Sequence, residues 1–67
     1  MTGEELKYYR TLRKITRRKL GVMLGYNDGR TAENMIQLFE SNRRALPPKH
    51  YRKISEILDI PLDKVVP

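Results

Sequence analysis

Residues 16–41 read TRRKLGVMLGYNDGRTAENMIQLFES, and this stretch decides the fold. Its first half predicts a helix over 17–24, because Thr16 is a good N-cap and the apolar residues recur at helical spacing. The inward residues of that helix are Leu20, Met23 and Leu24. Gly21 lies on the same stripe, where a missing side chain lets another helix approach closely. Gly25 supplies the C-terminal stop.

The second half begins with a turn and continues as another amphipathic helix. Tyr26-Asn27-Asp28-Gly29-Arg30 has the composition of a turn. A helix is predicted over 32–41, with Thr31 as its cap and Met35 at the edge of its apolar face. That face consists of Ala32, Ile36 and Phe39. Two amphipathic helices joined through a Gly-containing turn are typical of the helix-turn-helix pattern.

The flanking sequence predicts three more short helices. Thr2 and Glu5 form a capping box for a helix over 3–14, with Leu6, Tyr9 and either Leu12 or Arg13 inward and Ile15 buried after it. Pro47 and Pro48 suit the start of a helix over 48–58, and Pro61 opens a last one. No segment alternates as a strand does. We therefore expect a single all-α domain over residues 1–67, a bundle of five short helices.

Composition excludes several classes of protein. The 67 residues include no cysteine and one histidine, His50, so neither a disulfide framework nor a multi-histidine metal site is expected. No apolar run is long enough for a membrane span, and the N-terminus lacks the pattern of a signal peptide, so a cytoplasmic setting is expected. There is no nucleophile–base pair, and we expect neither an enzyme, a cofactor nor a small-molecule ligand.

The positive charge is concentrated in the N-terminal half. The chain has a net charge of +6, of which residues 1–30 carry +5. Between Arg10 and Lys19 there are six cations and no acid. Solvated surfaces usually interleave both signs, so this block favours a polyanionic partner, nucleic acid above all.

The order of residues resembles the lambda-repressor-like family, also called the XRE or Cro-type family, of helix-turn-helix DNA-binding domains. The resemblance covers almost the whole chain and rests on Leu6-Lys7-Tyr8-Tyr9-Arg10, Ile15-Thr16, Leu20, Leu24-Gly25, Ile36, Phe39-Glu40, Pro47, Ile54, Ile57-Leu58 and Leu62. The chain departs from the family pattern in having Arg17-Arg18-Lys19 where Gln and Glu are common, and Asn42 where Gly is common. Its predicted turn at residues 26–31 is also longer than usual.

The resemblance implies a transcriptional repressor that binds a palindromic operator in double-stranded DNA as a homodimer. Small phage and mobile-element regulators of this kind, the anti-CRISPR-associated repressors among them, often repress their own operon. The dimer surface is expected at the apolar C-terminus, at Leu62, Val65 and Val66. The resemblance also implies a structural ion pair between Arg10 and Glu40.

The helix predicted over 32–41 is the candidate reader of DNA bases. Its 100° step turns Asn34, Gln37, Leu38 and Ser41 outward, and Asn and Gln pair bidentately with adenine. The candidate base contacts are Arg30, Thr31, Glu33, Asn34, Gln37 and Leu38.

A second set of residues is expected to bind phosphates. Cations in the first turn of a helix oppose its dipole and cost stability. A phosphate bound at that helix end would reverse this cost, so Arg17 and Arg18 are expected to contact one. The candidate phosphate contacts are Thr16, Arg17, Arg18, Arg43, Arg44 and Lys49.

Two alternatives remain open. An antitoxin-like or adaptor module would use the basic face to bind a protein and would have only non-specific affinity for nucleic acid. An RNA-binding protein is less favoured, because the chain has only five aromatic residues and several of them are predicted to point inward.

Overall fold

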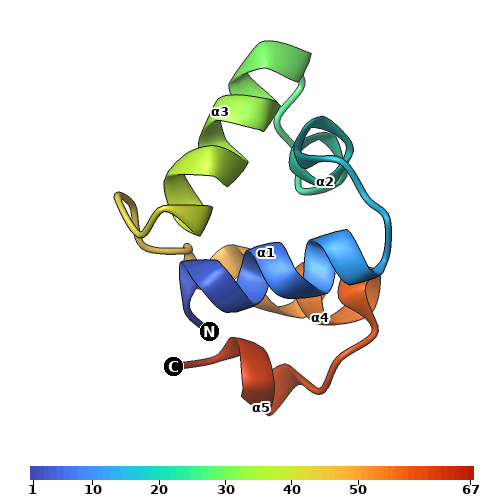
Figure 1. The fold of residues 1–67 in the computed structure, drawn as a ribbon, viewed down its shortest axis with the longest axis vertical. Coiled ribbons are helices and arrows are strands. Elements are labelled where there is room, and N and C mark those ends of the chain that lie inside the picture. Colours follow the sequence, from blue (N-terminus) through green and yellow to red (C-terminus); the bar gives the residue numbers. More distant parts are fainter.

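The computed structural model describes residues 1–67, which form five α-helices and one short 3₁₀ helix with no strand. The elements are α1 (Gly3–Leu12), α2 (Arg17–Met23), α3 (Gly29–Glu40), η1 (Pro48–His50), α4 (Tyr51–Leu58) and α5 (Leu62–Val65). The all-α fold with five helices is thus confirmed. Helices α2 and α3 pack together at one end of the molecule, and α5 lies at the other end, with α1 between them (Figure 1).

The predicted caps of the first two helices are confirmed. Glu5 N donates to Thr2 Oγ1 at 3.2 Å and Thr2 N donates to Glu5 Oε1 at 2.8 Å, which completes the capping box of α1. Thr16 Oγ1 caps α2 by accepting from Lys19 N at 3.0 Å. Helix α1 ends at Leu12 rather than at residue 14, because Lys14 takes a left-handed conformation with φ 58°.

The predicted start of the third helix is wrong by three residues. Helix α3 begins at Gly29, and its N-cap is Asp28 rather than Thr31. The Asp28 carboxylate accepts from both the backbone N–H and the hydroxyl of Thr31, at 3.1 and 3.0 Å, which draws Thr31 into the first turn. The connection to α2 is therefore residues 24–28, shorter than the sequence suggested and displaced toward the N-terminus.

The C-terminal part follows the prediction with one difference. The segment at Pro48 opens as the 3₁₀ helix η1 before α4 begins at Tyr51. Helix α4 ends at Leu58, its C-cap Asp59 has a φ of 54°, and Pro61 precedes α5 as expected. The Met1 ammonium group donates to the Val65 carbonyl oxygen at 3.1 Å, so the first residue lies against the last helix.

The core draws on all five α-helices. Its buried apolar members are Leu6, Leu20, Leu24, Ile36, Phe39, Ile54, Leu58 and Val65. Met23, predicted to point inward, is 42% exposed. Of the two alternatives for the inward stripe of α1, Leu12 is 55% exposed and Arg13 is exposed as well, so neither points inward. On α1 the inward position is taken by Arg10, which is buried.

The α2–α3 contact depends on Gly21, as its place on the apolar stripe predicts. A Cβ atom at Gly21 would lie 2.5 Å from the carbonyl oxygen of Ala32 and 2.6 Å from its Cβ. Ala32 is itself fully buried. The two helices therefore meet backbone to backbone, with no room for another methyl group.

We expect Gly21→Ala to destabilise the protein by about 1–3 kcal/mol, because α2 and α3 must separate to admit the methyl group. Thermal unfolding measures the loss, about 4–8 °C per kcal/mol for a domain of this size. The control is Gly29→Ala, where the new Cβ meets only the flexible Arg18 side chain. Equal melting temperatures for the two variants would show that the close contact is unimportant.

His50 joins the α2–α3 connection to the start of α4. Its Nε2 lies 3.0 Å from the Tyr26 hydroxyl, and its ring packs edge-on against Tyr26 and Phe39. Burial lowers the pKa of His50 below its ordinary value of 6.5, and the charge of Lys49 lowers it further. The neutral imidazole is therefore the form that fits the fold.

This predicts a pH-dependent stability. Because the unfolded chain binds the His50 proton more tightly than the folded one, the His50 contribution is intact above the ordinary pKa of 6.5 and is lost as the pH falls below it. Urea unfolding between about pH 5 and 7 measures the slope. His50→Phe, which keeps an aromatic ring without a titrating group, should flatten the profile; an unchanged slope would assign it to another group.

Candidate nucleic-acid interface

The outward face of α3 forms a shallow polar hollow. Its five lining residues are Asn34, Gln37, Leu38, Ser41 and Arg43, and its volume is about 420 Å³. Leu38 is half-buried, whereas the other four are exposed. The predicted outward residues of this helix thus share one face, and Arg43 from the following loop joins them.

The remaining candidate base contacts lie near the first two turns of α3. Arg30, Thr31 and Glu33 are all exposed. The Thr31 hydroxyl donates to Asp28. Glu33 Oε2 is 3.7 Å from Arg18 Nε, an exposed pair that contributes little to stability. Arg30, in the first turn of α3, is the N-terminal member of a row of exposed polar residues on this helix that continues into the hollow.

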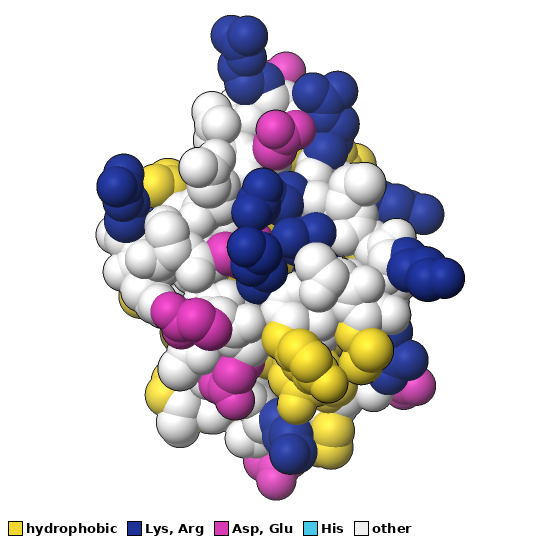
Figure 2. Space-filling model, in the orientation of Figure 1, with side chains coloured by type: hydrophobic (Ala, Val, Ile, Leu, Met, Phe, Trp, Pro, Cys, Tyr) yellow, Lys and Arg dark blue, Asp and Glu magenta, His cyan; other side chains and the backbone are white.

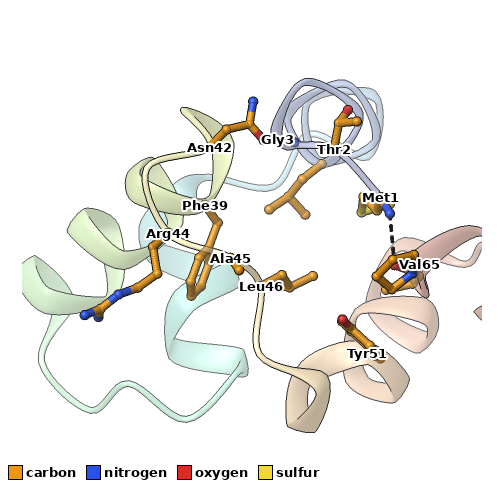
Figure 3. A pocket seen from close by; sticks show the side chains of 12 residues that line it. Met1, Thr2, Gly3, Phe39, Asn42, Arg44, Ala45, Leu46, Tyr51 and Val65 are labelled. Atoms are coloured by element: carbon orange, nitrogen blue, oxygen red, sulfur yellow. Dashed lines mark hydrogen bonds between the residues drawn. The ribbon is translucent and has the colours of Figure 1, made fainter.

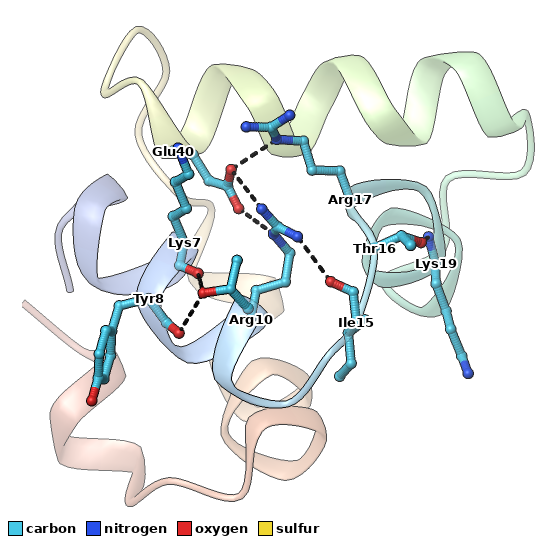
Figure 4. Close-up of polar contacts among 9 residues, drawn as sticks. Lys7, Tyr8, Arg10, Ile15, Thr16, Arg17, Lys19 and Glu40 are labelled. Atoms are coloured by element: carbon cyan, nitrogen blue, oxygen red, sulfur yellow. Dashed lines mark hydrogen bonds and ion pairs between the residues drawn. The ribbon is translucent and has the colours of Figure 1, made fainter.

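Glu40, at the end of α3, is a buried carboxylate shared by two arginines (Figure 4). Arg10 Nε of α1 donates to Oε2 at 2.5 Å, and its Nη2 donates to Oε1 at 3.4 Å. Arg17 Nε of α2 donates to Oε1 at 2.9 Å. The Arg10–Glu40 ion pair predicted from the resemblance is present, and Arg17 is an additional partner that the sequence did not indicate.

The two arginines differ in how many of their guanidinium nitrogens are free of hydrogen bonds within the protein. Arg10 also donates from Nη1 to the Ile15 carbonyl oxygen at 2.8 Å, so all three of its nitrogens are engaged. Arg17 is bonded through Nε alone, and its side chain is 38% exposed against 4% for Glu40. Arg17 therefore combines a fixed inner edge with an open outer edge.

The other candidate phosphate contacts are exposed, and they come from separate segments. Thr16 and Arg18 belong to the start of α2, Arg43 and Arg44 to the loop after α3, and Lys49 to η1. Lys and Arg side chains crowd the part of the surface around α2 and α3, whereas hydrophobic atoms gather below α1 (Figure 2). Arg44 Nη1 lies 3.7 Å from Met35 Sδ, so this side chain leans along the edge of α3.

Two polar residues have roles that the sequence did not indicate. Arg13 donates from Nε to the Leu58 carbonyl oxygen at 2.9 Å, and so fixes the end of α4. Asn42 is left-handed, with φ 61°, and its amide oxygen accepts from Gly3 N while its nitrogen donates to Glu4.

A second hollow lies on the side of the chain ends. It has a volume of about 380 Å³ and an apolar wall that includes Leu6, Phe39, Leu46 and Tyr51. The Met1–Val65 hydrogen bond borders it, and Arg44 extends away from the apolar wall (Figure 3). Nowhere do three acidic, histidine or cysteine side chains cluster as metal ligands would. No helix has both the length and the apolar character needed to cross a bilayer.

Of the three C-terminal residues predicted to form a dimer surface, the fold exposes two and buries one. Leu62 and Val66 are 43% and 41% exposed. Val65 is 1% exposed and belongs to the core, so it is removed from the predicted contact. Of the three predicted residues, only Leu62 and Val66 offer apolar area to a partner.

Comparison of the chain with protein-family models, with curated proteins and with solved structures finds no match.

The Glu40 cluster leads to a stability prediction. Glu40→Ala leaves Arg10 buried without its carboxylate partner, so we expect a loss of about 3 kcal/mol or more in the free energy of unfolding. Arg17→Ala leaves the buried Arg10–Glu40 pair intact and should cost less than about 1 kcal/mol, since Arg17 is partly exposed. Chemical denaturation of both variants tests the ranking, and equal losses would contradict it.

Proposed function

We propose that this protein is a sequence-specific DNA-binding transcriptional repressor of the lambda-repressor-like helix-turn-helix kind. In this proposal α2 and α3 are the two helices of the motif, and α3 enters the major groove. The resemblance described above motivates the assignment. The close α2–α3 contact at Gly21 and Ala32 is compatible with it.

The observation that carries the proposal is the polar outward face of α3, with exposed arginines on the chain segments before and after it. A helix of 12 residues is about 18 Å long and, with its side chains, about as wide as the major groove. Asn34 and Gln37 present exposed amides side by side, and each is suited to pair with adenine. Leu38 next to them supplies an apolar contact for a thymine methyl group.

The flanking cations account for affinity rather than for sequence choice. Arg17, Arg18 and Arg43 lie before and after α3 along the chain, on segments that can face the two DNA strands. Contacts to phosphates release counterions and carry no sequence information directly. A homodimer joined through Leu62 and Val66 would place two copies of α3 about 34 Å apart, in successive major grooves of a palindromic operator.

The decisive experiment is a binding titration with the duplex upstream of the protein's own gene and with a scrambled duplex, at two salt concentrations. Asn34→Ala should weaken binding to the cognate duplex by about 1–3 kcal/mol and leave the scrambled duplex unaffected. Arg43→Ala should weaken both alike and reduce the salt slope by about one.

The outcomes separate the candidate functions. Identical behaviour of the two variants on both duplexes would show that α3 does not read bases. Weak and equal binding of both duplexes by the unmodified protein would favour the protein-interaction module.

A further inference from the structure

We propose that Glu40 is a positioning residue for DNA-backbone binding: its buried carboxylate fixes Arg17 so that the free edge of the guanidinium faces a phosphate. This inference rests on the proposed function. It assigns to Glu40 a second role, beyond pairing with Arg10, through its contact with α2 (Figure 4).

The hydrogen-bond geometry supports this assignment. A guanidinium group has five N–H donors in a rigid planar fork. Arg17 uses only Nε–H, toward Glu40 Oε1 at 2.9 Å, so both of its Nη groups remain available. Arg10 donates to both oxygens of Glu40, and all of its nitrogens are engaged, so the position of the carboxylate is fixed by contacts that do not involve Arg17.

The charge balance of the cluster points the same way. Two guanidinium groups face one carboxylate, so the cluster keeps one positive charge in excess. Arg10 is buried and Arg17 is 38% exposed, so the excess charge is presented to solvent through Arg17. Helix α2 has no acid in its first turn that would offset this charge.

Fixing Arg17 in advance matters because a free arginine loses conformational freedom when it binds. Holding such a side chain in its bound geometry is worth about threefold to tenfold in affinity. By contrast, simple Coulomb attraction predicts that removing the Glu40 charge improves DNA binding and leaves the share of Arg17 unchanged or larger. Positioning by Glu40 therefore predicts that loss of its charge reduces the contribution of Arg17 to DNA binding, whereas Coulomb attraction predicts no reduction.

The test is a double-mutant cycle on binding to a mixed-sequence duplex, since phosphate contacts do not depend on sequence. Arg17→Ala should weaken binding about tenfold in the unmodified protein, and about threefold or less in a Glu40→Gln background. Arg43→Ala, the matched control, removes an exposed arginine that makes no hydrogen bond to Glu40 and should cost the same in both backgrounds. An equal or larger cost of Arg17→Ala in the Glu40→Gln background overturns the inference.

A measurement on the unmodified protein keeps the test decisive if Glu40→Gln does not fold. In NMR spectra the Nε–H of Arg17 should exchange with water far more slowly than that of Arg43, both before and after the duplex is added. Exchange as fast as that of Arg43 in either state overturns the inference. If the unmodified protein binds no duplex at all, the proposed function fails, and the exchange rates alone still report whether the Arg17–Glu40 contact exists.

Discussion

One buried carboxylate, that of Glu40, connects the three N-terminal helices. It accepts hydrogen bonds from α1 through Arg10 and from α2 through Arg17, while its own backbone ends α3. A charge this deep is tolerated only because both oxygens are occupied by cationic donors. The orientation of α3 relative to its neighbours depends on this contact together with the Gly21–Ala32 approach.

The cations of the chain consequently fall into two groups. Arg10 and Arg13 lie within the basic block, yet their guanidinium groups serve the fold by binding Glu40 and the end of α4. The remaining cations of that block retain donors directed to solvent. Net charge alone therefore overstates the surface available to a polyanion.

The sequence predicted those features of the fold that depend on neighbours along the chain. The capping box at Thr2, the cap at Thr16 and the bare face at Gly21 are local patterns, and all three are present. The start of α3 was misplaced because glycine is a poor helix former, and only the contacts of Asp28 reveal that Gly29 is helical. In a helix as short as α2, spacing alone did not settle the orientation of Met23.

For the candidate site, the outward face of α3 followed from its periodicity, whereas the Arg17–Glu40 contact did not. These residues are 23 positions apart, and nothing in either segment identifies the other as its partner. The roles of Arg13 and Asn42 were missed for the same reason, since each binds an element 38 or more residues away.

Three connections contain a residue other than glycine in the left-handed conformation: Lys14 after α1, Asn42 after α3 and Asp59 after α4. Such a conformation costs an ordinary residue about 1–2 kcal/mol. Asn42 has a compensating use, because its side chain ties the end of α3 to α1. No side-chain hydrogen bond of Lys14 or Asp59 offsets the strain in this way. Glycine at either of these two turns would remove the strain, and the net change in thermal stability is that relief less the conformational entropy, about 0.4–1 kcal/mol, that glycine adds to the unfolded chain.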